Sequence, residues 1–523
     1  MSSHPGLSYT QAGSLGRARL ERLCRYALFL CLALAGVAFL PHRAHAQTVP
    51  PAPFQIIGHI EKFTEDSPGA ILGSGKMTVN GIDVVIPKNT VLVFPASYQT
   101  MSQVFDGPHP KTPLTGLARK SGLAMADLPP PIAAFEATIV GNLVNGTYIA
   151  GLVFISQQSV NTADGFIKSI NFVTGELCVG STPAPVAGCL PPNSRVRIND
   201  PIGRYGLADG PTKVSPDERF SVDTDNPTIH AKNGYPMCVP RVAPPAADPL
   251  CPITNRPLGP TGPLTQFTSP NPTQQVPLML GDYITFQGTH AKDANPLNPL
   301  YVSAHTIEGN VAAFTPPGVT PYVFMEASKI GAGPSLVCPG AECANLTVDV
   351  GFTTDPTQTP NAAIYALDVG LDGIRRTRKL LVPSIKQAVV GRFRLDIAKA
   401  PQLLDSINPQ TRLAGGATRE YMLRIDDPQR SPALADGSLV PDAGNSPGLV
   451  RANGLIPGQY VFPMFDYIFG EGQPGGQPPP ANFQCLAFLA TGWGIKGQVL
   501  NIGQLSPWPD TIAPTAVSCA TAN

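Results

Sequence analysis

The sequence predicts an all-β protein made of several small β-barrel or β-sandwich domains, joined by proline-rich linkers and stabilised by disulfides. Three observations lead to this prediction. Prolines and glycines are abundant, at 59 and 51, only 14% of the residues are charged, and apolar residues almost nowhere recur at the helical period. Short alternating runs rich in Val, Ile, Thr, Phe and Tyr are instead separated by Asn-Gly, Asp-Gly and proline turns, as is typical of β-rich domains.

The first 46 residues have the three parts of a secretory signal peptide. Four arginines within Arg17–Arg25 form a basic region, Tyr26–Leu40 is an apolar run too short to span a bilayer, and Ala44–Ala46 is a small-residue cleavage site. We therefore expect a mature chain that begins near Gln47 and is secreted, either to the periplasm or outside the cell. No later apolar run has bilayer length, so we expect no transmembrane segment in the mature chain.

The mature chain is slightly acidic. Loss of the signal removes five basic and one acidic side chain from the 36 of each, which leaves 31 and 35 and a net charge of −4. Nucleic-acid binding needs clustered Lys and Arg, and the densest cluster, at 375–379, is interpreted as the solvated edge of a sheet. The expected partner is therefore an unknown ligand or protein, and not a nucleic acid.

Eight cysteines remain after the signal is removed, and they fall along the chain as four pairs of near neighbours. An even number in an oxidising compartment favours disulfides, and the simplest pattern joins each cysteine to its neighbour. Zinc binding is the weaker alternative, because no pair has C-x-x-C spacing and no histidine lies close in sequence. The predicted pairs are Cys178–Cys189, Cys238–Cys251, Cys338–Cys343 and Cys485–Cys519.

Two β-hairpins are marked by the turns Asn80-Gly81 and Asn145-Gly146, which suit a type I′ turn because both positions need positive φ. A weak internal repeat surrounds them, in which a glycine opens a strand, apolar residues follow at alternate positions, and a second glycine opens the next strand. We interpret the repeat as small β-barrels or sandwiches that close to protect their edges. Its two copies lie at 58–79 and 165–179.

Proline-rich stretches and shifts in composition mark the predicted domain boundaries, because such stretches favour extended, solvated backbone. The predicted segments are a signal peptide at 1–46, β-domain 1 at 54–128, β-domain 2 with a long polar loop at 132–241, a proline-rich linker at 242–275, β-domain 3 at 276–345, a sandwich-like domain at 346–426, and a C-terminal β segment at 447–523.

The segment Arg195–Arg241 is the one stretch dense in groups that can do chemistry, since the sequence has no G-x-S-x-G, H-E-x-x-H or dinucleotide-binding motif in a suitable setting. The candidate binding residues are Asp200, Arg204, Asp217, Arg219, Asp223, Asp225, Asn226 and His230.

Three interpretations of this segment stay open. In the first, it is an ordered loop held by Arg–carboxylate pairs, turn-capping Asp and Asn side chains and a disulfide at Cys238. In the second, Asp223 and Asp225 bind calcium with Asn226 beside them, and no other cofactor is expected. In the third, His230 and one of three aspartates transfer protons while an arginine holds an anionic substrate. The three aspartates are Asp200, Asp223 and Asp225.

Four runs of the segment share a recognisable pattern: Ile198–Tyr205, Ser215–Phe220, Asp225–His230 and Gly234–Cys238. These runs resemble the signature of a group of secreted bacterial and fungal proteins without known activity. The resemblance continues at 281–286 and 453–461 and covers most of the mature chain. It implies a secreted protein but transfers no functional residue.

Three classes of function follow from these observations. The leading prediction is a binding or surface-interaction protein, because several small β-domains on proline-rich hinges are suited to presenting loops to a partner. The alternatives are a secreted hydrolase that uses the Asp200–His230 segment and a structural component of an envelope or matrix.

Overall fold

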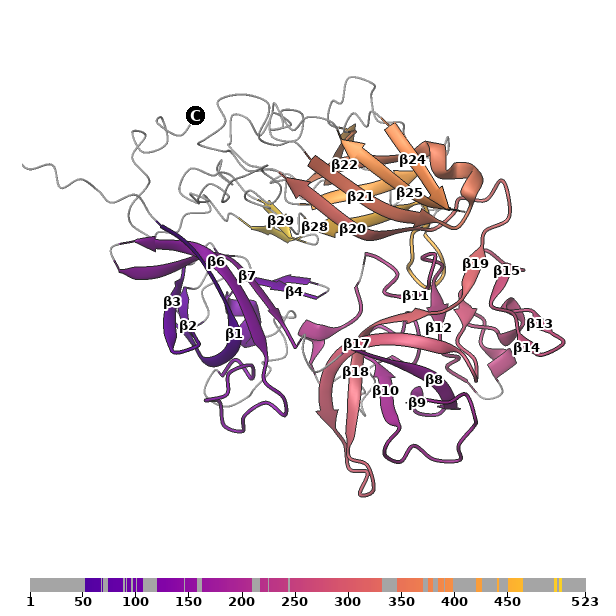
Figure 1. Ribbon diagram of the computed structural model, residues 1–523, viewed down its shortest axis with the longest axis horizontal. Coiled ribbons are helices and arrows are strands. Elements are labelled where there is room, and N and C mark those ends of the chain that lie inside the picture. The colour runs from indigo at the N-terminus through magenta and orange to yellow at the C-terminus, as the bar shows by residue number, and fades with distance from the viewer. Residues whose placement is uncertain are drawn as a thin grey trace, which may run out of the picture. The chain divides into compact units, whose positions relative to one another are not determined.

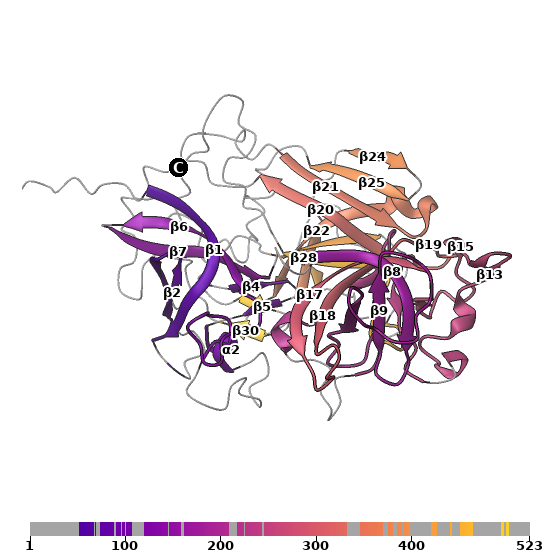
Figure 2. The ribbon, with the colours of Figure 1, turned by 60° about the horizontal axis from the view of Figure 1, so that its bottom comes forward.

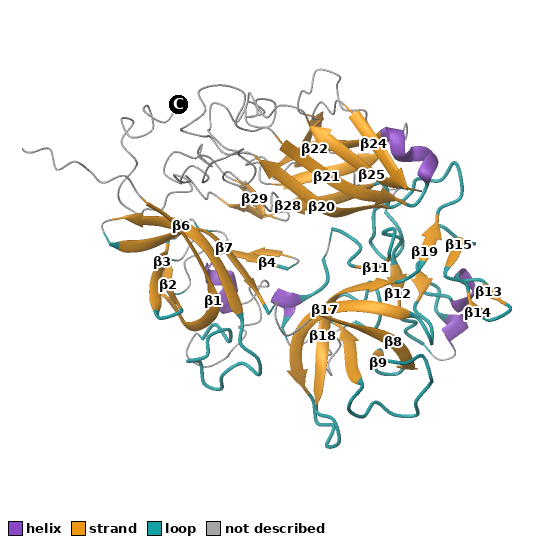
Figure 3. Ribbon diagram, viewed as in Figure 1, coloured by secondary structure: helices purple, strands orange, loops and turns teal. Residues whose placement is uncertain are grey.

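Strands dominate the computed structural model of this chain, which confirms the all-β prediction (Figure 3). Apart from brief gaps, the described residues are 52–106, 120–157, 162–208, 217–331, 346–397, 420–425, 440–441 and 450–463, with two further strands at 493–495 and 498–500. None of the helices among them has the length and apolar character needed to cross a bilayer.

The first sheet closes into a five-stranded barrel, called barrel 1 below (Figure 1). Its strands, in spatial order, are β3 (Ile82–Ile86), β2 (Gly75–Val79), β1 (Ala52–Glu65), β6 (Glu136–Val144) and β7 (Thr147–Ser156). A parallel pairing of β3 with β7 closes the barrel, while all its other pairings are antiparallel. Two short strands, β4 (Leu92–Phe94) and β5 (Ser97–Gln99), extend the sheet beyond β7.

The core of barrel 1 comes from alternate residues of its strands, as period-two burial requires. Helix α2 (Met101–Asp106) adds Met101, Val104 and Phe105 to this core (Figure 2). The β2–β3 turn is the predicted Asn80-Gly81, with φ of 52° and 72°. A Cβ on Gly58 would lie 2.1 Å from the Asn80 Oδ1 atom, so the glycine makes room for the side chain of the turn.

A second five-stranded barrel, called barrel 2, follows in the chain. Its strands, in spatial order, are β10 (Ser194–Ile198), β9 (Glu176–Gly180), β8 (Thr162–Asn171), β17 (Tyr283–Lys292) and β18 (Leu300–Gly309). A parallel pairing of β10 with β18 closes it, and β11 (Ile229–Ala231) adds to the far side of β18. Its core includes Ile167, Val196 and Phe286.

The two barrels share one connectivity. In each, the first strand pairs with the second and fourth, the fifth pairs with the fourth, and the fifth runs parallel to the third. This is the strand order of the OB-fold, a five-stranded Greek-key barrel found in many binding proteins.

The third and fourth strands of barrel 2 are joined by a long connection, residues 199–282, whose described part contains short strands and three 3-10 turns. Besides β11, the short strands are β12 (Met237–Cys238), which pairs with β16 (Val276–Pro277), β13 (Leu258–Gly259), which pairs with β14 (Gly262–Pro263), and β15 (Gln266–Thr268), which pairs with β19 (Ala312–Phe314) beyond the barrel. The 3-10 turns are η1 (Glu218–Phe220), η2 (Pro245–Ala247) and η3 (Ile253–Asn255).

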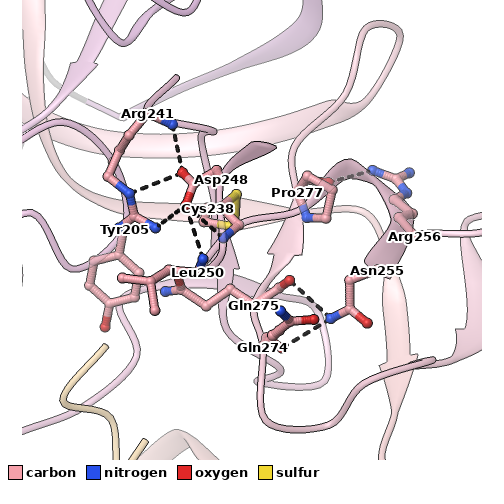
Figure 4. Close-up of a disulfide and its surroundings, with 12 residues drawn as sticks. Tyr205, Cys238, Arg241, Asp248, Leu250, Asn255, Arg256, Gln274, Gln275 and Pro277 are labelled. Atoms are coloured by element: carbon pink, nitrogen blue, oxygen red, sulfur yellow. Dashed lines mark hydrogen bonds and ion pairs between the residues drawn. A yellow bond between two sulfur atoms is a disulfide. The ribbon is translucent and has the colours of Figure 1, made fainter. Parts of the chain in front are cut away.

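Part of this connection, 242–275, corresponds to the predicted proline-rich linker, but it is folded (Figure 4). The predicted disulfide Cys238–Cys251 is present, and Asp248 accepts hydrogen bonds from the backbone of Cys251 and from the Arg241 side chain. The buried Asn255 side chain donates to the carbonyl oxygens of Asn271, Gln274 and Gln275. In this proline-rich segment, side-chain donors and acceptors thus form the hydrogen bonds that backbone N–H and carbonyl groups would otherwise form with a neighbouring strand.

Two larger antiparallel sheets and one two-stranded sheet make up the rest of the described chain. One contains, in order, β20 (Val323–Gly331), β21 (Leu346–Thr353), β25 (Arg392–Ile397) and β24 (Ser384–Val389). The other contains β27 (Val440–Pro441), β23 (Arg375–Lys379), β22 (Ala362–Val369), β26 (Glu420–Ile425) and β28 (Gln459–Pro463). The 3-10 helix η4 (Pro356–Asn361) precedes β22, and β29 (Trp493–Ile495) pairs with β30 (Gln498–Leu500).

Three sequence interpretations differ from these sheets. Barrel 1 extends across Pro129–Pro131, where a domain boundary was predicted, because β6 pairs with β1. Strands β17 and β18, assigned to β-domain 3, complete barrel 2. The basic strand β23 lies between β22 and the two-residue β27, and so is second from the edge of its sheet.

Candidate functional site

All eight candidate residues lie in the first half of the connection that joins β10 to β17. They do not converge on one point. The structure instead engages them in four separate groups, each with its own partners, described here in chain order.

The first group is centred on Asp200, which is buried at the start of the connection. Its Oδ2 atom accepts hydrogen bonds from the backbone N–H of Tyr205 at 2.6 Å and of Gly206 at 3.1 Å, and so fixes a turn. Burial raises the pKa of Asp200, although these hydrogen bonds oppose the shift. The Tyr205 hydroxyl donates to the carbonyl oxygen of Asn226 at 2.9 Å and links this turn to the third group.

The second group is the pair Asp217 and Arg219. Asp217 caps η1 by accepting from the backbone N–H of Arg219 at 3.0 Å, and its carboxylate pairs with the guanidinium at 2.7 Å. The buried Arg219 Nη1 donates to two carbonyl oxygens close to α2, those of Val104 at 2.8 Å and Ser121 at 2.7 Å. This arginine therefore ties the connection of barrel 2 to barrel 1.

Phe220, the next residue, is fully buried and belongs to the core of barrel 1. Its ring centroid lies 5.3 Å from that of Phe94 and 5.0 Å from that of Phe135, both residues of the barrel 1 core. The core of the first barrel is thus completed by a side chain from the connection within the second.

The third group is a turn made by Asp223, Asp225 and Asn226. Asp223 accepts from the Asp225 N–H at 2.8 Å and from the Asn226 Nδ2 at 2.9 Å, and its carbonyl oxygen accepts from Arg204. The buried Asn226 amide pairs with both backbone groups of Val461 on β28: its Oδ1 accepts from the Val461 N–H at 2.6 Å, and its Nδ2 donates to the Val461 carbonyl oxygen. One amide side chain therefore replaces a strand partner for β28.

The fourth group is His230 on β11. The ring is buried, its Nδ1 donates to the carbonyl oxygen of Ala231 at 2.8 Å, and its centroid lies 4.3 Å from that of Phe324 on β20. Burial lowers the pKa of His230 to about 4, so the imidazole is neutral at pH 7.

These contacts define what the segment can do chemically. Asp200 Oδ2 and His230 Nδ1 hydrogen-bond to separate backbone groups, and both carboxylate oxygens of Asp223 are engaged in its own turn. Asp200 Oδ1 and Asp225 Oδ2 are buried without a hydrogen-bond partner. Among the described residues, no group of three or more His, Cys, Asp and Glu side chains is arranged to hold a metal ion.

A second feature, which sequence reasoning missed, lies on barrel 2. Three leucines, two in neighbouring loops and one at the start of β18, expose much of their side chains: Leu190 at 49%, Leu297 at 74% and Leu300 at 42%. The residues between and beside them include the exposed Pro191, Pro192, Pro296 and Pro299. We call Leu190, Leu297 and Leu300 the apolar loop pair.

The two loops are tied to each other and to the barrel. The disulfide Cys178–Cys189, as predicted, fixes the first loop to β9. The buried Asn298 of the second loop donates its Nδ2 to the Cys189 carbonyl oxygen at 3.0 Å, and its own carbonyl oxygen accepts from Arg195.

Ion pairs support the base of both loops. Arg195 on β10 pairs with Glu176 at 2.7 Å and with Asp293 at 2.6 Å, and its hydrogen bond lowers the pKa of the Asp293 carboxyl well below its usual range. Arg197 joins the same two carboxylates and lies over the Tyr301 ring, 4.4 Å from its centroid. The exposed leucines thus lie at the end of barrel 2 where these ion pairs hold the two loops in place.

No protein-family model, curated protein or solved structure matches this chain. Fold and site together define an all-β protein with two OB-type barrels, in which the predicted site is an internal junction and the apolar loop pair is an exposed surface.

Proposed function

We propose that this protein is a secreted, non-catalytic binding module that contacts a protein partner through the apolar loop pair of barrel 2. The predicted signal peptide and the two disulfides support secretion, since disulfides persist in oxidising compartments. The shared connectivity of the barrels supports the predicted repeat of small β-domains. OB-type barrels serve many binding functions, but that is an analogy of fold and carries less weight than the surface itself.

The single observation that carries the proposal is an exposed apolar surface on an ordered support. Monomeric proteins seldom leave clustered aliphatic side chains in water, and such clusters mark interaction sites. The polar backbone of the tip is already occupied: Leu190 O accepts from the Asn193 N–H, and the Asn295 Oδ1 accepts from the N–H groups of Leu297 and Asn298. A loop ordered before binding loses little conformational entropy when a partner docks.

The contacts of Asp200, Arg219, Asn226 and His230 support a scaffold role for the long connection. In this view the junction holds barrel 1 and the strands β20 and β28 against barrel 2, and the surface that meets the partner lies elsewhere.

A displayed library of random peptides tests the proposal. Peptides selected on the mature, oxidised protein should bind it and should lose about tenfold or more in affinity, roughly 1.4 kcal/mol, when Leu297→Asn replaces the most exposed leucine of the pair. Val173→Asn is the matched control, because Val173 is 80% exposed but lies in the separate β8–β9 turn. Failure to enrich any peptide, or equal binding by Leu297→Asn, would contradict the proposal.

A further inference from the structure

The two disulfides among the described residues differ in their access to solvent. Cys238 and Cys251 are both fully buried within the folded connection of barrel 2. Cys178 is buried on β9, but its partner Cys189 is only half-buried and lies in the β9–β10 loop. A dissolved thiol can therefore reach the first disulfide from the Cys189 side, whereas the second is shielded on both sides.

The loop that the Cys178–Cys189 bond closes, residues 181–193, pairs with no strand, and most of its residues are exposed. Two hydrogen bonds attach its first half to β8. The Val186 N–H donates to the Lys168 carbonyl oxygen at 3.2 Å, and the Lys168 Nζ donates to the Thr182 hydroxyl at 3.1 Å. Neither bond reaches the second half of the loop.

The second half of the loop carries Leu190 of the apolar loop pair. The preceding residue, Cys189, is fixed by its disulfide and by the hydrogen bond that its carbonyl oxygen accepts from the Asn298 Nδ2 at 3.0 Å. The Leu190 carbonyl oxygen accepts from the N–H and Nδ2 of Asn193, which belongs to the same loop. The disulfide is therefore the covalent link that keeps Leu190 beside the loop of Leu297.

We propose that the Cys178–Cys189 disulfide is a redox switch for the apolar loop pair. The inference rests on the proposed function, because it concerns the same surface. With the disulfide closed, Leu190 is held beside Leu297 and the surface binds its partner. Reduction enlarges the set of conformations open to the loop, so a partner has to order it again and binds more weakly.

The switching step is a thiol–disulfide exchange with a dithiol as the reductant. A thiolate of the dithiol attacks the Cys189 Sγ atom, the bond to the Cys178 Sγ atom breaks, and Cys178 leaves as a thiolate that takes up a proton. The second thiolate of the dithiol then attacks the reductant's own sulfur in the mixed disulfide and releases Cys189, which is protonated in turn. The protein gains two electrons and two protons, and the dithiol becomes a disulfide.

The barrel itself should withstand this step. The buried Cys238–Cys251 bond stays closed, and the base of both loops is held by ion pairs that do not involve Cys189. These pairs join Arg195 to Glu176 at 2.7 Å and to Asp293 at 2.6 Å. Reduction should therefore release the second half of the loop and leave barrel 2 closed.

The first test treats the full mature protein with dithiothreitol and follows the alkylation of free thiols by peptide mapping. Cys178 and Cys189 should become alkylated at least about tenfold faster than Cys238 and Cys251, because access governs the exchange. Equal rates for the two disulfides, or alkylation that begins only as the protein unfolds, would overturn the proposal.

The second test measures the affinity of a library-selected peptide whose binding requires Leu297. Reduction should weaken binding by about tenfold or more, and reoxidation should restore it. The folded double variant Cys178→Ser/Cys189→Ser should bind weakly under both conditions. Thr182→Ala is the matched control, because it removes the bond to Lys168 from the same loop, keeps the disulfide and should bind as wild type does.

The outcomes separate the switch from the proposed function. A peptide that requires Leu297 and binds reduced and oxidised protein equally overturns the switch alone, whereas peptides that all bind without Leu297 overturn both proposals. Native-state hydrogen exchange needs no peptide: on reduction the Asn193 N–H should lose protection while β8 and β17 keep theirs. Unchanged protection of Asn193 would also overturn the switch.

Discussion

Truncation of Phe220 should show that barrel 1 depends on the connection within barrel 2. The side chain is fully buried against Phe94 and Phe135 of barrel 1. The strands that precede and follow it in the chain, β10 and β11, belong to the sheet of barrel 2. Phe220→Ala removes the ring and leaves a cavity in the barrel 1 core, which costs about 3–5 kcal/mol in comparable buried sites. We therefore expect the free energy of unfolding to fall by about that amount.

The assay is chemical denaturation of the mature, oxidised protein combined with native-state hydrogen exchange. Protection should fall in β2, β6 and β7 of barrel 1, far in sequence from the substitution. Phe166→Ala is the matched control, since Phe166 is half-buried on β8 and packs edge-on against Tyr283 within barrel 2. A loss below about 1 kcal/mol, or exchange that changes only around Phe220, would refute the reasoning.

Three further predictions concern the junction and its charges. Asn226→Ala removes both hydrogen bonds to Val461 and leaves buried backbone groups without partners, so stability should fall by about 2–4 kcal/mol in denaturant titration, while Asn171→Ala in the exposed β8–β9 turn should change it far less. The pKa values of His230 and His305 are both lowered to about 4 by burial, so the unfolded chain takes up protons first as pH falls. The free energy of unfolding should therefore decline between pH about 6.5 and 4, by up to about 3 kcal/mol per histidine. In the double variant His230→Gln/His305→Gln this decline should be much smaller. The control His59→Gln, at an exposed site, should keep it. Asp293, whose pKa is lowered by its hydrogen bond from Arg195, loses its contribution only at more acid pH, and a slope confined to that range would argue against the histidine account. Calcium and chelator should leave the melting temperature unchanged, because Asp223 uses both carboxylate oxygens within its own turn. If calcium raises the melting temperature, a chelator reverses the rise and Asp223→Asn abolishes it, the segment contains a calcium site.

Local signals in the sequence predicted local structure well. The Asn80-Gly81 turn forms as expected because positive φ at both positions is a property of those two residues. The pairs Cys178–Cys189 and Cys238–Cys251 were predicted from spacing and are confirmed, while Cys338–Cys343 and Cys485–Cys519 lie outside the described residues.

Contacts between distant residues could not be predicted in this way. Arg219 reaches the Val104 carbonyl oxygen across 115 residues, and Asn226 meets Val461 across 235, so no short window contains both partners. Proline content was misleading for the same reason. The prolines of 129–131 and 242–275 suggest hinges, but residues beside the first segment and within the second bond to other parts of the chain.

The candidate residues form a dense polar segment in the sequence, but their role depends on those distant partners. Asp223, Asp225 and Asn226 have the composition of a calcium loop, and only the contact of Asn226 with β28 shows the turn to be part of a junction. The apolar loop pair gave no sequence signal, because Leu190 and Leu297 come together through the contact of Cys189 with Asn298.

The central claim is that the Asp200–His230 segment holds the fold while the apolar loop pair binds the partner. The most direct test is the affinity of one library-selected peptide for Leu297→Asn and Asn226→Ala, measured at a temperature where both variants are folded. The account predicts that Leu297→Asn loses about tenfold or more and that Asn226→Ala binds as wild type does. Loss of binding by Asn226→Ala with full retention by Leu297→Asn would contradict it and would return the binding site to the junction.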